Sequence, residues 1–477
     1  MSVVSVCAIA LPGDDLPYDS ADEASILAYA KLLERKTLRQ VITERLPKEA
    51  AEQLIASLSR GAGRGRFGQA VEEGHFSYKP NSKAAPDFGE MELKCTPLIL
   101  KDNTLASKER IVICKINFGG DNQSKIPCIL DETFETSHAW AKLRKLLLIF
   151  YEHLDANALD LPIKLAAIWS PTDEERKIMK EDWNRIQGMV NEGRAHEISE
   201  GMTLLLGACT KASDSSVRTP QAKSAEPAKP RAFALKQSYA QTIYESLCGD
   251  AKAFPKMSDI KSYLGAKGTF ETWLEQKINR FRNMTLEEIC SELNIEKRSE
   301  GLGQHATSVR AILNVLLAGS DSKSYGNLAE LRKTGLQIKT VRIEPNGKPA
   351  QAMSFPAFNY AELAAEITWE DSSLYDLFTR RFFLIFLHDD GNGDCVLARA
   401  VFWSMPESDL DQCETVWKQA VLAAKTKRYE LMPGMKDSLI AHVRPHDQRG
   451  GPDMKRCYWL NKGYIERLWL KVKPPKA

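Results

Sequence analysis

The sequence lacks the features that mark membrane and secreted proteins. No apolar run approaches the roughly 18 residues that a membrane-spanning helix needs. The first residues, MSVVSVCAIALPGDD, have no basic segment before the apolar stretch and run directly into acids, unlike a secretory signal. These absences predict a cytoplasmic protein that does not associate with membranes.

Cysteine usage excludes two further classes. The chain has 10 cysteines, but none form a Cys-x-x-Cys pair, and no cluster of Cys and His has the spacing of zinc ligands. We therefore expect reduced, mostly buried thiols rather than a disulfide framework or a structural zinc site.

An excess of charge of one sign is also lacking over the whole chain, because its 477 residues include 65 Lys and Arg and 63 Asp and Glu. The distribution is uneven, however. Between Val421 and Ala477 there are 13 Lys and Arg but only 5 Asp and Glu. A basic end on a neutral chain is compatible with a nucleic-acid surface. The length itself predicts two or three domains.

The two halves of the sequence repeat a pattern of tryptophans and strands. Trp169 precedes Trp183 by 14 residues, and Trp403 precedes Trp417 by the same spacing. Upstream, LLLIFYEHLD (146–155) parallels FFLIFLHDDG (382–391), and downstream RAFAL (231–235) parallels RCYWL (456–460). Because tryptophan is rare, the recurring spacing predicts two copies of one mixed α/β (α+β) domain.

We place the copies at residues 1–250 and 255–477. The stretch 212–231, ASDSSVRTPQAKSAEPAKPR, lies inside the first copy, and its composition predicts a mobile loop that builds no core. Two copies in one chain predict an internal pseudo-dimer, which suits a ligand with two-fold symmetry.

The segment PDFGEMELKCTPL (86–98) carries the residues best suited to chemistry. Glu92 and Lys94 begin an apolar run that reads as a strand, so their side chains share one face, and Asp87 lies just before them. Two carboxylates suit a hard divalent cation such as Mg²⁺, and a lysine beside them can orient water and stabilise charge on a phosphate. This Asp…Glu-x-Lys arrangement is typical of many metal-dependent nucleases, although an acid-x-Lys pair alone is more often a solvated strand edge.

Two flanking segments add candidate side chains. GRFGQAVE (65–72) reads as a glycine-containing loop entering a helix that bears Glu72, and it is not a Walker A loop. FETSHAWAKL (134–143) places His138 and Lys142 one helical turn apart. Taken alone, each is compatible with an ordinary surface.

Together these segments resemble the MutH family, which comprises the mismatch-repair nicking endonuclease and the type II restriction enzymes that share its fold and cut at GATC. The motifs occur in the family's order and span nearly all of the first copy. The resemblance implies tandem restriction-endonuclease-like domains of the PD-(D/E)xK, MutH-like type. It also implies metal ligands at Asp87, Glu92 and the Leu93 carbonyl, a catalytic Lys94, an auxiliary carboxylate at Glu72 and a second lysine, Lys142, near the scissile phosphate. The loop before RAFALK would read bases in the major groove, with Lys211, Arg231 and Lys236 as candidate contacts.

The second copy lacks the charges that this chemistry needs. Its counterpart of MELKC is LQIKT (336–340), in which Gln337 replaces the glutamate, and no lysine falls where Lys142 lies in the first copy. Its late segment remains basic, so we expect it to bind DNA without cutting it. The candidate DNA contacts there are Arg444, Arg449, Lys455, Arg456 and Lys462.

The leading interpretation is therefore a Mg²⁺-dependent type II restriction endonuclease that cuts double-stranded DNA, 5′ of the G in GATC, leaving 5′-phosphate and 3′-hydroxyl ends. A methyl-directed or mismatch-repair nickase and a non-catalytic DNA-binding protein remain as alternatives. One catalytic site per chain predicts a homodimer assembled on DNA. Restriction predicts a functional pairing with a DNA methyltransferase in a bacterial-type cytoplasm.

Overall fold

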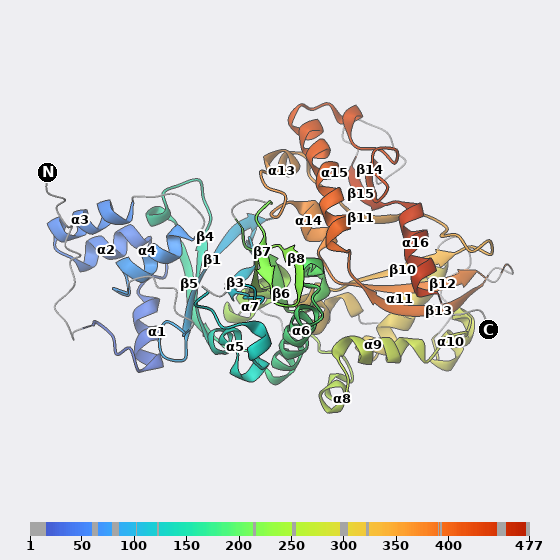
Figure 1. The fold of residues 1–477 in the computed structure, drawn as a ribbon, viewed down its shortest axis with the longest axis horizontal. Coiled ribbons are helices and arrows are strands. Elements are labelled where there is room, and N and C mark those ends of the chain that lie inside the picture. Colours follow the sequence, from blue (N-terminus) through green and yellow to red (C-terminus); the bar gives the residue numbers. More distant parts are fainter. Residues whose placement is uncertain are drawn as a thin grey trace. The chain divides into compact units, whose positions relative to one another are not determined.

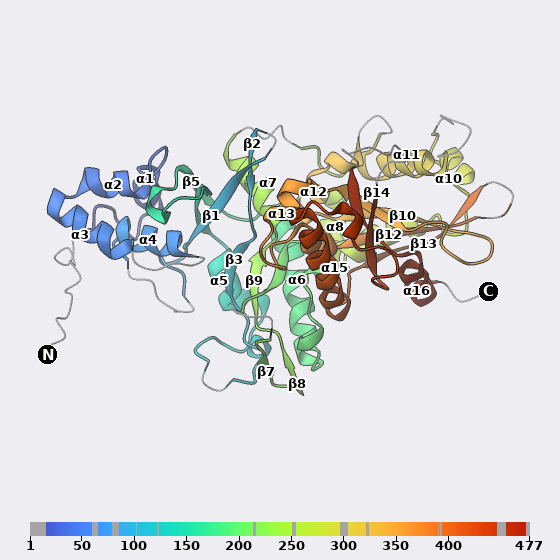
Figure 2. The same ribbon diagram turned by 90° about the horizontal axis from the view of Figure 1, so that it is seen from above.

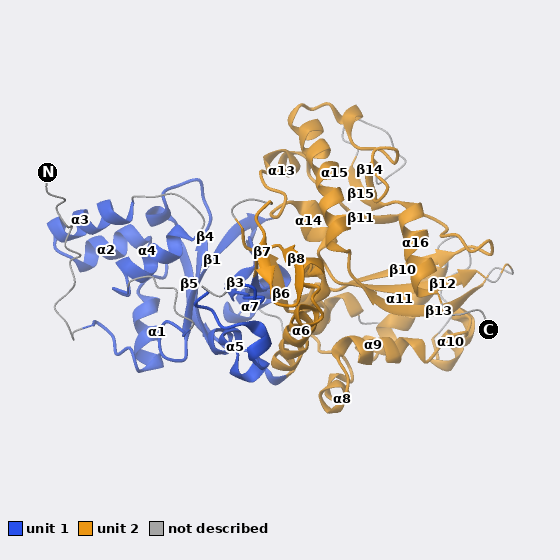
Figure 3. Ribbon diagram, viewed as in Figure 1, with its two compact units in different colours: residues 1–173, 232–251 blue, residues 174–231, 252–477 orange. Residues whose placement is uncertain are grey.

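The computed structural model describes residues 16–59, 65–78, 85–101, 103–121, 124–212, 216–249, 254–295, 304–320, 324–389, 391, 394–445 and 455–473. Arg449, one of the expected DNA contacts, lies outside these residues. The chain divides into two compact units (Figure 3). Unit 1 contains residues 1–173 and 232–251, and unit 2 contains residues 174–231 and 252–477.

Unit 1 begins with four helices that gather beside a mixed sheet (Figure 1). The helices are α1 (Glu23–Lys31), α2 (Leu38–Arg45), α3 (Lys48–Leu58) and α4 (Arg66–Gly74). Local signals fix their starts: Asp22 accepts two backbone N–H groups at the start of α1, and Thr37 forms a capping box with Gln40 at α2. Gly65 supplies the left-handed conformation, with φ of 88°, that precedes α4.

The sheet of unit 1 has the strand order β2-β1-β4-β5. Its strands are β1 (Glu92–Lys101), β2 (Thr104–Ser107), β4 (Leu146–Glu152) and β5 (Ile163–Trp169). The β1 and β4 strands pair in parallel, with Glu92 opposite Leu146, while the other pairs are antiparallel. Because β4 is buried from Leu146 to Phe150, it reads as an unbroken apolar run rather than an alternating one.

A second group of elements completes unit 1. It comprises β3 (Ile111–Lys115), the short 3₁₀ turns η1 (Ile129–Asp131), η2 (Phe134–Thr136) and η3 (Ala158–Asp160), α5 (His138–Leu143), β9 (Arg231–Leu235) and α7 (Gln237–Leu247). The β9 strand pairs antiparallel with β3 along Ala232–Leu235 and leads directly into α7. Elements distant in sequence thus meet beside the sheet that starts at Glu92.

Unit 2 opens with α6 (Asp173–Asn191), η4 (Ala195–Glu197), η5 (Glu200–Met202), β6 (Leu206–Thr210), β7 (Thr219–Gln221) and β8 (Ser224–Ala228). The buried carboxylate of Asp182 on α6 accepts the N–H groups of Leu204, Leu205 and Leu206, at 2.8, 2.7 and 2.9 Å. This single acid therefore ties the helix to the chain that enters β6.

The expectation of a loop over 212–231 is wrong for residues 216–231. The β7 and β8 strands form an antiparallel hairpin beside α6 (Figure 2). Gln221 and Ala228 are buried in it, and the Gln221 amide donates to the Glu226 carbonyl at 2.6 Å. Backbone pairing and this buried amide order the segment although it holds almost no bulky apolar residues.

The rest of unit 2 adds a helical layer and a second set of strands. The helices are α8 (Ile260–Gly265), α9 (Phe270–Asn279), α10 (Leu286–Glu292), α11 (Gln304–Ala318), α12 (Ala329–Thr334), α13 (Tyr360–Ala365), α14 (Ser373–Phe378), α15 (Glu407–Lys425) and α16 (Lys462–Val472), with 3₁₀ turns η6 (Tyr325–Asn327) and η7 (Tyr429–Leu431). The strands are β10 (Gln337–Ile343), β11 (Met353–Ala357), β12 (Phe382–Asp389), β13 (Cys395–Trp403), β14 (Ala441–Pro445) and β15 (Arg456–Leu460).

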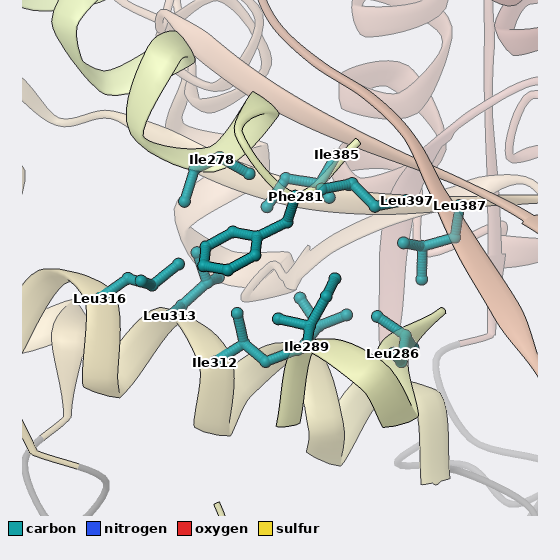
Figure 4. Close-up of a pocket in the computed structure, with 11 residues that line it drawn as sticks. Ile278, Phe281, Leu286, Ile289, Ile312, Leu313, Leu316, Ile385, Leu387 and Leu397 are labelled. Carbon is teal, nitrogen blue, oxygen red and sulfur yellow. The ribbon is translucent and has the colours of Figure 1, made fainter. Parts of the chain in front are cut away.

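The β10-β12-β13 sheet lies between α9–α11 on one side and α15 with α16 on the other (Figures 1 and 2). Where α9–α11 cover β12 and β13, apolar side chains enclose a cavity of about 20 Å³ (Figure 4). A cavity of this size has room for about one water molecule, and its walls offer no polar partner.

Elements of the two halves correspond in order and pairing. Parallel β10 and β12 with antiparallel β13 repeat parallel β1 and β4 with antiparallel β5. Gln337 stands opposite Phe382 as Glu92 stands opposite Leu146. The helices that follow also match, because α6 and α15 each have 19 residues and α7 and α16 each have 11. Within the described residues, no helix is long and apolar enough to cross a membrane.

Candidate active site

Glu92 and Lys94 are the first and third residues of β1, and their side chains share one face of the strand, as their spacing predicts. The Nζ of Lys94 donates to Oε1 of Glu92 at 2.6 Å. The Glu92 side chain is 3% exposed and the Lys94 side chain 21%, so the pair is largely shielded from water. A buried carboxylate keeps its charge only with such partners.

Lys142 approaches the same carboxylate from α5. Its Nζ donates to both oxygens of Glu92, at 3.0 Å each. Two ammonium groups from different elements therefore converge on one carboxylate, although Lys142 is 50 residues away in sequence. The structure thus brings together three of the side chains that the sequence selects.

The short helix α5 is fixed at its first turn. The Ser137 hydroxyl accepts the N–H of Trp140, and the Glu132 carboxylate accepts the N–H of His138 at 2.8 Å. The His138 ring also bonds Glu132, 3.0 Å from Nδ1. Burial favours the neutral ring, but hydrogen bonds to Cys114 and Glu132 raise the pKa of His138 to about 10. The role of Glu132 was not predicted, because its only signal in the sequence is an acid six residues before the histidine.

Asp87 stands in the turn before β1. Its Oδ2 accepts the N–H of Leu93 at 3.0 Å, and Gly89, with φ of 59°, forms the turn between Phe88 and Met91. Burial and, second, the nearby Glu92 carboxylate raise the pKa of Asp87, while the Leu93 N–H acts in the opposite sense. Asp87 and Glu92 are therefore close enough for their charges to interact.

Glu72 on α4 is close enough for its charge to interact with this group. Burial, and then the charges of Asp87 and Glu92, raise the pKa of Glu72 to about 7, while Lys94 opposes them. Carboxylates that raise one another's pKa form a site that favours an added cation.

The donor set suits a hard divalent cation. Glu72, Asp87 and Glu92 supply only oxygen atoms, the ligand type that Mg²⁺ prefers. Across the part of the chain that the structure describes, no three His, Cys, Asp or Glu side chains form a ready-made metal cage. Mg²⁺ is typically held by one or two carboxylates and keeps several waters.

The shifted pKa of Glu72 predicts a pH-dependent cost to stability. Its folded pKa of about 7 lies above the ordinary 4.5, so the folded chain binds the proton more tightly, and stability falls as pH rises from 4.5 to about 7. We expect Glu72→Gln to raise the melting temperature of the metal-free protein by a few degrees at pH 8, or about 1 kcal/mol, and to change it little at pH 5. The measurement is calorimetry at both pH values, with the neighbouring Glu73→Gln as the control. A Glu72→Gln chain that is less stable at pH 8 would contradict this assignment.

In the second half, the strand positions that correspond to Glu92 and Lys94 hold a neutral amide and a lysine instead of a carboxylate–lysine pair. The Nζ of Lys339, which occupies the place of Lys94, donates to the Ser354 carbonyl at 2.9 Å. Gln337 occupies the place of Glu92, and α14 carries no lysine. Glu330, which lies upstream of β10 on α12, accepts the Met257 N–H at 2.9 Å.

Arg231 and Lys236, which were expected to contact DNA, are buried, and this expectation is corrected for both residues. Arg231 is 2% exposed; its guanidinium donates to the carbonyl groups of Ile198 and Ala208 and pairs with Glu407 at 3.0 Å. Lys236 is 7% exposed where α7 begins. Arg231 is thus a structural cation, and its partner Glu407 was not predicted because no local pattern links residues so far apart.

The remaining candidates lie at the surface. Lys211, Lys455 and Lys462 are exposed, while Arg444 and Arg456 are half-buried. The Arg444 guanidinium stacks on the Trp459 ring, 3.5 Å from its centroid. These side chains are available to phosphates or base edges.

Comparisons with known proteins agree with this geometry. Residues 76–182 match the family model "DNA mismatch repair enzyme MutH". The chain is 32% identical to the type II restriction enzyme Sau3AI of Staphylococcus aureus over 460 residues, which cover 87% of this chain and 91% of that protein. It is 28% identical to the DNA mismatch repair protein MutH of Vibrio vulnificus over 42% of this chain and 85% of that protein, and 28% identical to MutH of Vibrio parahaemolyticus over 42% and 84%.

These matches define the class as DNA endonucleases of the MutH type. Within that class, the match to a restriction enzyme spans both halves of the chain, whereas the repair proteins match less than half. The chain therefore belongs to the family of MutH-related type II restriction endonucleases, which are site-specific deoxyribonucleases.

Proposed function

We propose that the protein cuts double-stranded DNA at GATC, 5′ of the G, in a Mg²⁺-dependent hydrolysis that leaves 5′-phosphate and 3′-hydroxyl ends. The observation that carries this proposal is the convergence of Lys94 and Lys142 on the buried carboxylate of Glu92, beside Asp87 and Glu72. The GATC site and the scissile position rest on the sequence resemblance to the family.

In the proposed mechanism, Asp87, Glu92 and the Leu93 carbonyl would hold Mg²⁺, with Glu72 as the auxiliary carboxylate. When bound there, Mg²⁺ would supply charge neutralisation at the phosphate and Lewis-acid activation of water. Lys94 orients the attacking water, whose oxygen forms the new bond to phosphorus. Lys142 stabilises the negative charge that develops on the phosphate oxygens. The P–O3′ bond breaks, and the 3′-oxygen leaves and takes up a proton.

We further propose that the chain contains two MutH-like domains, in residues 1–250 and 255–477, which form an internal pseudo-dimer. The shared strand order and the identical register of β1 with β4 and of β10 with β12 support the duplication. Compact packing groups residues 174–231 with the second copy, so the proposed domains interpenetrate in this segment. Gln337 and the absence of a lysine on α14 support a second copy that binds DNA and does not cut it.

One cutting site per chain implies that two chains, or two successive nicks, are needed for a double-strand break. We propose a homodimer assembled on DNA. We also propose that a DNA methyltransferase protects the same sites in a bacterial-type cytoplasm, because unprotected host DNA would otherwise be cut.

The test is incubation of the purified chain with unmethylated plasmid in Mg²⁺ or in EDTA, followed by sequencing of the ends. We expect discrete double-strand breaks before GATC in Mg²⁺ only. Open circles without linear product would instead support the nickase, and intact plasmid with specific binding would support a non-catalytic DNA-binding protein. Random or metal-independent ends would contradict the proposed site and cofactor.

A further inference from the structure

Lys142 reaches the active site from a helix that is too short to hold its own position. The α5 helix has six residues, and Lys142 lies in its last turn, with its Nζ 3.0 Å from both carboxylate oxygens of Glu92. A helix of this length is marginal by itself, so contacts from outside the helix must fix it. The contacts at its first turn therefore help to decide where Lys142 lies.

Those contacts converge on His138, the first residue of α5. The Glu132 carboxylate accepts the His138 backbone N–H at 2.8 Å and also bonds the ring, with Oε2 at 3.0 Å from Nδ1. On the other side of the ring, Nε2 lies 3.2 Å from the Lys115 carbonyl of β3, the strand beside α5 (Figure 1). The His138 and Glu132 side chains are 6% and 8% exposed, so water competes little for these bonds.

The two ring contacts fix the protonation state of His138. A carbonyl oxygen can only accept a hydrogen bond, so Nε2 must carry a proton. An ionised carboxylate also accepts, so Nδ1 must carry a proton as well, and the ring is a cation. Burial lowers the pKa of His138, but hydrogen bonds to the two titratable groups that face the ring, the Cys114 thiol of β3 and Glu132, outweigh it. A doubly protonated ring is no general base, but it can tie the Glu132 carboxylate to β3.

We infer that Glu132 is a positioning residue, which through its ion pair with the charged His138 ring holds α5, and with it Lys142, against Glu92. The inference rests on the proposed function and adds to it a residue outside the proposed set of metal ligands and lysines. Cleavage is sensitive to such positioning, because a displacement of about 1 Å can slow a reaction about a hundredfold. DNA binding is expected to be less sensitive, because the candidate DNA contacts are on other elements.

The test compares single-turnover cleavage in Mg²⁺ with binding of a duplex in EDTA. We expect Glu132→Ala to slow cleavage about ten- to hundredfold and to leave the dissociation constant for DNA within about twofold of wild type. Glu132→Gln keeps a side chain that can hydrogen-bond to His138, so it should recover part of the lost rate. Asp131→Asn is the matched control, because Asp131 is the adjacent acid and is exposed. Melting temperatures establish that each variant is folded.

A double-mutant cycle with Lys142→Ala shows whether Glu132 acts through that lysine. If it does, Glu132→Ala slows cleavage much less when the Lys142 side chain is already absent, because the exact position of α5 then matters less to the reaction. Equal fold-changes in the two backgrounds would mean that Glu132 affects cleavage by another route, and they would overturn the inference.

The charged ring is tested in the wild type, where no substitution can impair folding. The chain has 8 histidines, and the pKa of His138 is raised to about 10. Nitrogen-15 NMR at about pH 8 is therefore expected to show a ring with both nitrogens protonated, and Glu132→Gln should lose this signal. Neutral rings alone at this pH would overturn the ion pair and the inference with it.

Failure of the inference is distinguishable from failure of the proposed function. Wild-type cleavage rates in both Glu132→Ala and Glu132→Gln would overturn the inference and leave the proposed function intact. A wild-type chain that shows the charged ring but does not cut DNA would refute the proposed function, and the positioning role with it, while the ion pair itself would stand.

Discussion

A Glu92→Gln chain is expected to bind duplex DNA with near wild-type affinity and to cut it about a thousandfold more slowly, or not at all. Both Lys94 and Lys142 contact the Glu92 carboxylate, which is almost fully buried. An amide in its place is a poor Mg²⁺ ligand, and it leaves the two ammonium groups without their counter-charge. The loss falls on the chemical step because the DNA-contacting candidates lie elsewhere.

Single-turnover cleavage and binding in EDTA separate these effects. Glu90→Gln is the matched control, since Glu90 is two residues away, 66% exposed and paired with Arg144. It should cut at the wild-type rate. If high Mg²⁺ restored Glu92→Gln to full activity, the carboxylate would serve metal affinity alone. Wild-type cleavage by Glu92→Gln at ordinary Mg²⁺ would show that this cluster is not the active site.

The second large effect concerns stability: Glu407→Ala is expected to lower the free energy of unfolding by about 3–5 kcal/mol. Glu407 is buried at the start of α15 and pairs with Arg231 at 3.0 Å and with Lys229 at 2.9 Å. Those side chains are 1% and 16% exposed. Removing the acid leaves the buried Arg231 guanidinium without the carboxylate that it contacts, while Lys229 keeps Asp411.

Urea denaturation measures this loss, and Asp411→Ala is the control. Asp411 also pairs with Lys229, at 2.6 Å, but it is 49% exposed, so its loss should cost less than about 1 kcal/mol. Because an unpaired buried charge causes the damage, Arg231→Met combined with Glu407→Leu should be more stable than Glu407→Ala alone. Equal effects of Glu407→Ala and Asp411→Ala would show that the pair is not buried in solution.

Local patterns predicted the parts of the structure that depend on local physics. The period-two spacing of Glu92 and Lys94 predicted that both side chains lie on one face of a strand. Lys142 was predicted to lie one helical turn after His138, and both residues are on α5, from which Lys142 reaches Glu92. The matching tryptophan spacing anticipated equivalent strand pairs, since Trp169 and Trp403 end β5 and β13 at corresponding registers.

Long-range contacts were beyond such patterns. Arg231 looked like a surface cation in a polar segment, and only the fold brings the distant Glu407 to it. The β7–β8 hairpin was missed because its composition is that of a linker, while backbone pairing and the buried Gln221 amide order it. Glu132 was missed because an acid before a helix usually faces solvent, whereas here it binds the His138 N–H and ring.

The Arg231–Glu407 pair has a consequence for the history of the chain. If the halves arose by duplication, an ancestral single copy had no Glu407, so the arginine at the start of β9 must then have faced water or been another residue. Under the proposed duplication, burial of this arginine would make the two halves interdependent, because a fragment that ends before Glu407 would keep the Arg231 charge and lose the carboxylate that it contacts. The proposed second copy would then be needed for folding whether or not it cuts DNA.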